Sequence, residues 1–259
     1  MGKLLSKRKI KPLFIGFGNQ ALAYADVLNF LNVKISAVCV TNVDKNATKI
    51  NRYKIDKIFN SLDKALSSNT YNCIFIFLPW HKIEKKIIYI MQRTNKIIFC
   101  EKPLALSLKK IMEIKTYLNK YNKRLYILYN RRYLNTLRFL EKKRKYIFKS
   151  EIFIPEKKDK LVKILGKKII GKIKYHYTSH WLDFFNVIFN KKVKSIKKEK
   201  NFYKFLYNNI KNINFKLIYS EKKTINAKFH TKKSLYKLET LEKLYKYSKT
   251  KKKYIIIIN

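Results

Sequence analysis

The chain has 259 residues, with 61 lysines and arginines against 16 aspartates and glutamates, so its formal net charge is +45. This length is enough for a full hydrophobic core and favours two modest domains over one large one. No apolar run reaches the ~18 residues that a membrane-spanning helix needs, so we expect a cytoplasmic protein with no membrane partner.

A strong positive charge often indicates a nucleic-acid ligand. Here, however, the lysines are spread along the whole chain, and residues with AT-rich codons are abundant while there are only 5 glycines and 4 prolines. A biased genome explains this composition, so we do not expect a nucleic-acid partner. Cys39, Cys73 and Cys100 each lie in an apolar run without a second cysteine nearby, which predicts buried thiols and no metal site.

Residues 12–30 predict a strand, a glycine turn and a helix, in that order. In a dinucleotide-binding unit the first glycine permits a tight turn, the second lets the backbone approach the pyrophosphate, and a small third residue allows close packing of helix on strand. Two of the five glycines stand here, which makes the pattern informative. The candidate residues for binding NAD or NADP are Gly16, Gly18, Asn19, Gln20 and Ala21.

The next predicted strand, residues 35–40, ends at Thr41 and Asn42. An acidic residue at such a position holds the ribose 2′-hydroxyl of NAD. A hydroxyl and an amide can bind the ribose or tolerate a 2′-phosphate, with Lys45 nearby, so the choice between NAD and NADP stays open. Asn42 can equally be a polar strand end and no more.

The run at 72–78 is continuously apolar, as in a strand covered on both faces, and it stops at Pro79, Trp80 and His81. At the carboxyl end of a strand these three residues are candidate contacts of a nicotinamide. Alternatively, Trp80 packs beneath the helix predicted for residues 82–93.

A short strand at 97–100 is ended by Pro103, which leaves Glu101 and Lys102 at the carboxyl end of that strand. Ligands bind at this edge of an open parallel sheet, so both residues are expected in the cofactor crevice. Ser107 is expected to cap a helix that runs to about residue 120, and residues 125–129 predict one more strand. Such alternation of strands and helices predicts a parallel sheet.

The second half is less regular. Residues 171–175 predict a strand, and a helix from residue 179 places His180 and Asp183 on one face at i,i+3 spacing. This spacing can hold an imidazole and a carboxylate at one site, although such pairs are more often plain surface. Further patterns predict strands at 213–219, 224–230, 235–238 and 254–258 and a short helix at 241–245. The last strand is expected to pair in a sheet or at a homo-oligomer interface.

The motifs GFGNQA, LPWH, CEKPL, YNRRY from Tyr129, and HWLD from His180 resemble, in order and spacing, those of the Gfo/Idh/MocA (glucose-fructose oxidoreductase / inositol dehydrogenase) family. The resemblance implies an α/β fold: a Rossmann-type parallel sheet in an NAD(P)-binding domain, residues 1–131, followed by a smaller α+β domain with an open, mostly antiparallel sheet, residues 132–259. The chain is short for the family, so this second domain, for substrate and oligomerisation, is expected to be trimmed.

The resemblance also implies an enzyme, an NAD(P)-dependent oxidoreductase that transfers a hydride between the nicotinamide and a secondary alcohol or ketone of a sugar, cyclitol or sugar nucleotide. His180 is the expected base, because an imidazole titrates near working pH, and Lys102 is expected to stabilise the developing negative charge. Asp183 or His176 would orient the imidazole. Asn130 and Arg131 are candidate substrate contacts, since a guanidinium suits a carboxylate or phosphate.

Two positions depart from the family pattern. Members often carry a second histidine where this chain has Ile83, and many carry an aspartate where this chain has His176. These departures favour, as the alternative, a catalytically degenerate nucleotide-binding member that acts as a sensor or partner subunit. A basic nucleic-acid-binding protein is a second alternative, supported by the net charge alone.

Overall fold

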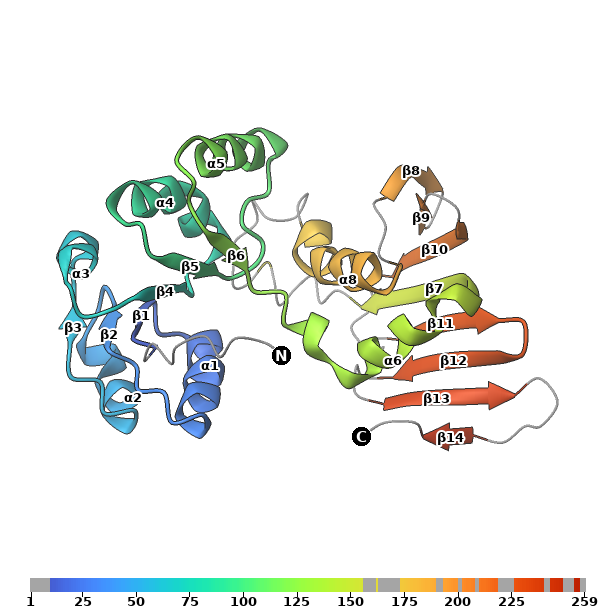
Figure 1. Ribbon diagram of the computed structural model, residues 1–259, viewed down its shortest axis with the longest axis horizontal. Coiled ribbons are helices and arrows are strands. Elements are labelled where there is room, and N and C mark those ends of the chain that lie inside the picture. Colours follow the sequence, from blue (N-terminus) through green and yellow to red (C-terminus); the bar gives the residue numbers. More distant parts are fainter. Residues whose placement is uncertain are drawn as a thin grey trace, which may run out of the picture. The chain divides into compact units, whose positions relative to one another are not determined.

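The computed structural model describes residues 10–155, 162, 173–189, 193–199, 202–207, 210–218, 226–239, 243–248 and 254–256. The chain divides into two compact units, Met1–Leu128 and Tyr129–Asn259 (Figure 1). This division falls three residues before the expected end of the nucleotide-binding domain at residue 131. Each unit is built around one sheet.

The first unit contains a six-stranded sheet in the order β3-β2-β1-β4-β5-β6, and every strand pair is parallel. The strands are β1 (Pro12–Ile15), β2 (Ala37–Cys39), β3 (Ile58–Phe59), β4 (Cys73–Ile76), β5 (Ile97–Cys100) and β6 (Leu125–Ile127). All residues of β1 and β4 are buried, as expected for central strands covered on both faces. The predicted Rossmann-type parallel sheet is therefore confirmed.

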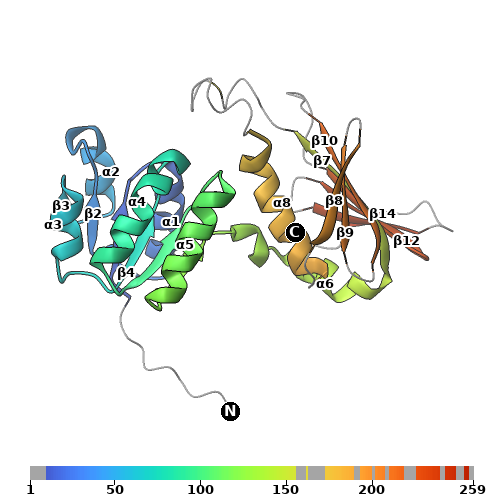
Figure 2. The same cartoon turned by 90° about the horizontal axis from the view of Figure 1, so that it is seen from above.

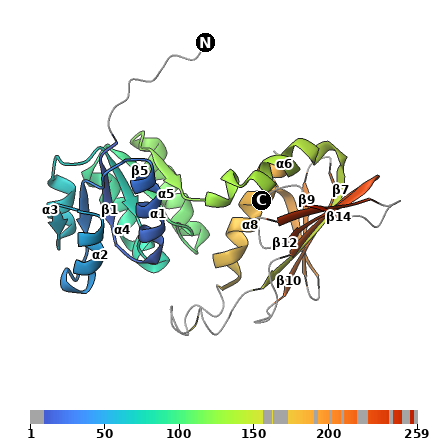
Figure 3. The same cartoon turned by 90° about the horizontal axis from the view of Figure 1, so that it is seen from below.

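Helices cover both faces of this sheet (Figures 1 and 3). One face carries α1 (Asn19–Phe30) and α2 (Ala47–Arg52), which follows the single turn η1 (Asp44–Asn46); the other carries α3 (Leu62–Ser67), α4 (Trp80–Arg93) and α5 (Leu108–Lys120). Side chains alternate along a strand, so Phe14 packs with the α1 core while Leu13 and Ile15 pack with the α4 core. Ser107 caps α5 as expected, and its hydroxyl accepts a hydrogen bond from the Lys110 N–H at 3.2 Å.

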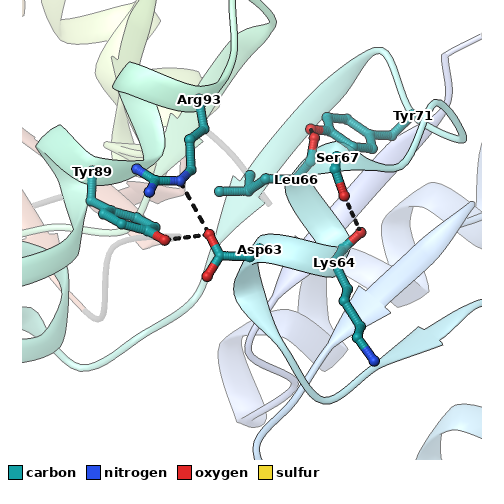
Figure 4. A network of polar contacts seen from close by, with 7 residues as sticks. All are labelled: Asp63, Lys64, Leu66, Ser67, Tyr71, Tyr89 and Arg93. Carbon is teal, nitrogen blue, oxygen red and sulfur yellow. Dashed lines mark hydrogen bonds and ion pairs between the residues drawn. The ribbon is translucent and has the colours of Figure 1, made fainter.

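A polar network ties α3 to α4 at the surface of the first unit (Figure 4). The Asp63 carboxylate accepts a hydrogen bond from the Tyr89 hydroxyl and lies 3.1 Å from Nε of Arg93, whose guanidinium stacks over the Tyr89 ring. The Tyr71 hydroxyl donates to the carbonyl of Leu66 near the end of α3 at 2.8 Å. The charged groups are exposed, so the ion pair adds only about 0–1 kcal/mol and the buried helix faces supply most of the stability.

The second unit contains an eight-stranded sheet in the order β14-β13-β12-β11-β7-β10-β9-β8 (Figure 2). Its pairs are antiparallel except β7 with β10, so the mostly antiparallel sheet is confirmed. The strands are β7 (Ile147–Pro155), β8 (Val193–Glu199), β9 (Phe202–Tyr207), β10 (Ile210–Ile218), β11 (Asn226–Thr231), β12 (Ser234–Glu239), β13 (Lys243–Ser248) and β14 (Tyr254–Ile256).

Two helices, α6 (Asn135–Lys143) and α8 (Ile173–Phe189), share one core with this sheet. Trp181, Phe184 and Phe185 of α8 are fully buried in it beside Phe229 of β11. The single turns η2 (Asn130–Tyr133) and η3 (Arg144–Tyr146) flank α6. Among the described residues, no helix combines the length and the apolar character needed to cross a bilayer.

Two local predictions for the second unit are wrong. Residues 173–175 form the first turn of α8 and not a strand, because extending a helix that is anchored by buried aromatic residues costs less than starting a separate strand. Residues 243–245 begin β13 and not a helix, because Leu244 pairs with Leu238 of β12 and both side chains are buried. The strands β7, β8 and β9 were not expected. Residues 171–172 and 241–242 lie outside the described residues.

Candidate functional site

The strand order of the first sheet reverses between β1 and β4. The chain adds β2 and β3 on one side of β1, and then β4, β5 and β6 on the other side. Ligands of open parallel sheets bind at the carboxyl ends of strands beside such a switch point. Gly16 ends β1 there with φ of +88°, and its N–H donates to the carbonyl of Cys39 at 2.9 Å. A Cβ on Gly16 would lie 2.8 Å from the carbonyl oxygen of Phe77. Only glycine fits this turn without strain.

Gly18 is the N-cap of α1. Its surroundings are open, whereas those of Gly16 are crowded. A Cβ built on Gly18 would meet no atom within 4 Å, so the fold itself does not require glycine here. The open space lies at the amino end of a helix, where Asn19 and Gln20 are exposed and Ala21 is fully buried against the sheet. First-turn N–H groups lack acceptors within their own helix and bind anions. The five predicted residues therefore lie together, at a helix N-terminus that could hold a pyrophosphate.

Thr41 and Asn42 follow β2 at the same edge, and both are exposed. The Asn42 side-chain oxygen accepts a hydrogen bond from the Lys45 N–H at 2.8 Å, and the Asn42 carbonyl accepts one from the Asn46 side chain at 2.7 Å. Asn42 therefore closes the turn into η1. Thr41, also exposed at this strand end, is the other candidate contact of the ribose.

Pro79, Trp80 and His81 follow β4 and begin α4. Pro79 is the N-cap, and its carbonyl accepts hydrogen bonds from the N–H groups of Lys82 and Ile83 at 2.8 and 3.0 Å. The Trp80 and His81 rings meet edge to face with their centroids 5.6 Å apart, and His81 is exposed. Ile83, where many relatives of the family have a histidine, is buried in the core.

Glu101 and Lys102 follow β5, and both are half-buried. The Glu101 N–H donates to the carbonyl of Ile76 at 3.0 Å, which joins this turn to the end of β4. Burial raises the pKa of the Glu101 carboxyl above its ordinary value, and the neighbouring Lys102 ammonium opposes that rise. The Lys102–Pro103 peptide bond is cis. The carboxyl edge of the sheet thus carries a carboxyl group and an amine after β5, with the end of β4 between them and the glycine turn that follows β1.

The predicted residues of the second unit gather where η2 meets α8. Arg132 of η2 binds Asp183 of α8 through two hydrogen bonds, one of them from Nε to Oδ2 at 2.7 Å. Asp183 is buried, and Arg132 is half exposed. The ring of His180, one turn before Asp183, lies edge-on to the Tyr129 ring with a centroid distance of 5.9 Å. Burial and the Asp183 charge raise the pKa of Tyr129, and Arg132 and a hydrogen bond with Ser179 lower it.

Asn130 is exposed, while the guanidinium of Arg131 stacks 4.7 Å from the centre of the buried Trp181 ring. This contact holds the Arg131 side chain against α8. His176 belongs to α8, one turn before His180, and its side chain lies outside the described residues. Within the described part of the chain, no group of three or more metal-ligating side chains is present.

The structure thus brings the predicted cofactor residues to one edge of the first sheet, and it brings His180, Asp183 and Arg131 to one face of the second unit. Sequence reasoning assigned no role to Tyr129, Arg132 or Trp181. The two arginines stand side by side, and the sequence holds no sign of which one pairs with Asp183. Only the packing of η2 on α8 distinguishes them.

Residues 10–129 match the model of the Gfo/Idh/MocA oxidoreductase family, described as an NAD-binding Rossmann fold. No curated protein matches the chain. Among solved structures, the WlbA dehydrogenase of Chromobacterium violaceum, in complex with NADH and UDP-GlcNAcA, is similar with a TM-score of 0.76 and 14% identity, over 98% of this chain and 79% of that one.

Two other similar structures have different roles. Myo-inositol 2-dehydrogenase of Lactobacillus plantarum has a TM-score of 0.75 and 15% identity, over 89% of this chain and 76% of that one. A super-repressor mutant of Gal80p of Saccharomyces cerevisiae has a TM-score of 0.78 and 14% identity, over 96% and 79%. At such identities these likenesses show the fold alone. The family match covers the first unit, which contains the glycine turn, the open N-terminus of α1 and the Glu-Lys-Pro turn. The likeness to the Gfo/Idh/MocA oxidoreductases at the level of sequence is therefore confined to the first unit, which matches their NAD-binding Rossmann fold.

Proposed function

We propose that the protein is an NAD(P)-dependent oxidoreductase that interconverts a secondary alcohol and a ketone on a sugar, cyclitol or sugar nucleotide. The observation that carries the proposal is the carboxyl edge of the first sheet. There a turn that accepts only glycine and an open helix N-terminus follow β1, and the Glu101–Lys102 pair follows β5, two strands away in the same sheet. The substrate class is suggested by the relatives of the same fold, among them a dehydrogenase solved with UDP-GlcNAcA and a myo-inositol dehydrogenase.

In this proposal the first turn of α1 binds the pyrophosphate, and Thr41 contacts the adenosine ribose. Trp80 and His81 contact the nicotinamide, which accepts or supplies the hydride when bound. Lys102 hydrogen-bonds the reacting oxygen and stabilises negative charge on it. His180 takes the hydroxyl proton during oxidation and returns it during reduction.

The other candidate residues of the second unit orient His180 or recognise the substrate. Arg132 holds Asp183, and through the shared helix turn this pair fixes the position of His180. His176, one further turn toward the start of α8, is the second candidate to orient the imidazole. Arg131 supplies a planar donor set for a carboxylate or phosphate of the substrate, with Asn130 beside it. The sheet of this unit is the proposed surface for homo-oligomer formation.

The test separates coenzyme binding from turnover. We expect NADH or NADPH to bind the wild-type protein saturably, observed as a change in nicotinamide fluorescence. With a panel of sugars, cyclitols and nucleotide sugars, Lys102→Met should lower kcat by about 10²-fold or more, in line with the loss of one charge-stabilising group. Lys109→Met is the matched control, because Lys109 is exposed on α5 and the substitution removes the same charge.

Three results would separate the alternatives. If Lys102→Met and Lys109→Met lower kcat by the same factor, Lys102 does not stabilise charge on the reacting oxygen. Binding of coenzyme without turnover of any panel member would favour a nucleotide sensor or partner subunit. Failure to bind either coenzyme, with binding of an oligonucleotide that weakens steeply in salt, would favour the nucleic-acid alternative.

A further inference from the structure

The second unit has a cavity of about 850 Å³ that none of the proposed catalytic or coenzyme residues lines. Described residues of three chain segments line it: the stretch from the end of α6 to the start of β7, the β11–β12 hairpin from Thr231 to Tyr236, and one position of β13. Half of its lining residues are lysines, although lysine makes up only about one residue in five of the whole chain. They are Lys143, Lys145, Lys232, Lys233 and Lys246.

Among the described residues, no acidic side chain lines this lysine pocket to balance its charge. Within the described residues, none of the ion pairs involves the five lysines, whereas Lys149 and Lys237 of the same unit pair with Glu151 and Glu239. A concave surface lined by one sign of charge concentrates the field and attracts a ligand of the opposite sign. The complementary ligand is therefore an anion with several charges.

The turn that carries two of these lysines is fixed by buried hydrogen bonds. The Thr231 hydroxyl donates to the Ser234 carbonyl at 2.8 Å, and the Ser234 N–H donates to the Thr231 hydroxyl oxygen at 2.9 Å. Both residues are only 6% exposed, while Lys232 and Lys233 between them are exposed. The backbone that presents the two ammonium groups is thus ordered before a ligand arrives, which lowers the entropic cost of binding.

Aromatic rings line the same pocket. Tyr146 and Phe148 are 55% and 41% exposed, which is unusual for large apolar side chains. The Lys145 ammonium lies 5.0 Å from the centre of the Tyr146 ring. Exposed aromatic faces beside basic side chains suit a nucleobase with attached phosphates, because the base stacks while the phosphates meet the lysines. The cavity volume also falls within the ~300–1,000 Å³ of small-molecule sites.

We infer that this lysine pocket binds a nucleoside polyphosphate, with the phosphates held by Lys232, Lys233 and their lysine neighbours and the base stacked on Tyr146 or Phe148. The site is composed entirely of residues of the second unit. It goes beyond the proposed oxidoreductase function, which uses the carboxyl edge of the first sheet and the η2–α8 face.

The test is calorimetric titration of the full chain with ATP and with inorganic tripolyphosphate at physiological salt. Lys232→Glu/Lys233→Glu should weaken the binding of both ligands by about tenfold or more, since charge reversal replaces two attractions with two repulsions. Lys109→Glu/Lys115→Glu changes the net charge by the same amount on the exposed surface of α5 and should leave the affinity within about twofold. Equal losses in the two double variants, or no binding to the wild type, would overturn the proposal.

A second variant tests whether the pocket recognises a nucleobase. Tyr146→Ala/Phe148→Ala should weaken ATP binding several-fold and leave tripolyphosphate binding unchanged. Equal effects on both ligands would show that no base is recognised and would overturn the nucleoside part of the proposal. Tighter binding of a single-stranded oligonucleotide through the same lysines would overturn the small-ligand assignment. NADH titration of the wild type and of the lysine variant reports on the first unit separately, so a failure of the coenzyme proposal remains distinguishable.

Discussion

Arg132 and Asp183 join two elements that are 51 residues apart in sequence by a pair of parallel hydrogen bonds. The Asp183 side chain is only 7% exposed, so its charge depends on the guanidinium for compensation. The pair fixes η2 on α8 within the second unit, one helix turn from His180. Two charged residues that resemble ordinary surface in the sequence thus form an internal clamp.

Arg132→Ala is expected to destabilise the second unit by about 1–3 kcal/mol. Removing one partner of a fully buried pair costs ~3–5 kcal/mol, and the half-exposed guanidinium lowers that figure because water reaches it. Chemical denaturation followed by tryptophan fluorescence measures the loss, in a Trp80→Phe background so that Trp181 alone reports. Arg138→Ala is the control, since Arg138 is exposed on α6 and among the described residues has no ion pair.

The pairing itself is tested by adding Asp183→Asn to Arg132→Ala. The double variant no longer contains a lone buried carboxylate, so it should lose less stability than the sum of the two single variants. Additive losses would show that Arg132 and Asp183 act independently.

Gly16→Ala and Gly18→Ala should have opposite effects. Gly16→Ala places a Cβ 2.8 Å from the Phe77 carbonyl oxygen at a φ of +88° and should destabilise the first unit by about 1–3 kcal/mol. Gly18→Ala meets no protein atom within 4 Å, so the free energy of unfolding should change by less than ~0.5 kcal/mol. The added methyl group should nevertheless weaken NAD(P)H binding about tenfold, because it occupies the approach of the pyrophosphate. Unchanged coenzyme affinity in a folded Gly18→Ala would argue against that approach.

Thr41→Asp is expected to shift the coenzyme preference toward NADH by about tenfold or more. A carboxylate at the end of β2 accepts hydrogen bonds from the two ribose hydroxyls and repels a 2′-phosphate. Parallel titrations with NADH and NADPH give the ratio of the two dissociation constants. Asn42→Ala is the matched control. It removes the cap on the Lys45 N–H, which should cost roughly 1 kcal/mol, and it should leave the coenzyme ratio unchanged.

Glu101 should make stability depend on pH. Burial raises the pKa of this carboxyl in the folded state, so its contribution to stability is fully present below the unfolded pKa and is lost as pH rises through the folded pKa. Glu101→Gln, which does not ionise, should therefore unfold at a higher temperature than the wild type at pH 8, and the difference should shrink toward pH 4. Thermal scans of the coenzyme-free protein measure it.

Glu113→Gln provides the comparison for that scan. Glu113 lies on the exposed side of α5, 2.8 Å from Lys110, so its removal should not produce a gain that grows with pH. If the two variants show the same pH profile, the behaviour of Glu101 does not arise from its burial.

Much of the first unit could be predicted because its signals are local. Gly16, Gly18 and Ala21 act within one turn between adjacent elements, and the Ser107 cap bonds an N–H three residues away. Continuous apolar runs identified β4, all of whose residues are buried, and β5, in which Ile98 and Cys100 are buried. The order of these signals along the chain was enough to give the parallel sheet.

The sequence by itself determined the Rossmann sheet and the likeness of the first unit to the Gfo/Idh/MocA family model, since both depend on residues that are neighbours in the chain. Only the tertiary structure decided that Arg132 rather than Arg131 pairs with Asp183, and that residues 173–175 join α8. It also decided that five lysines from three segments line one pocket. These features rest on contacts between residues far apart in sequence, and local periodicity cannot register such contacts because it describes only which face of one element is apolar.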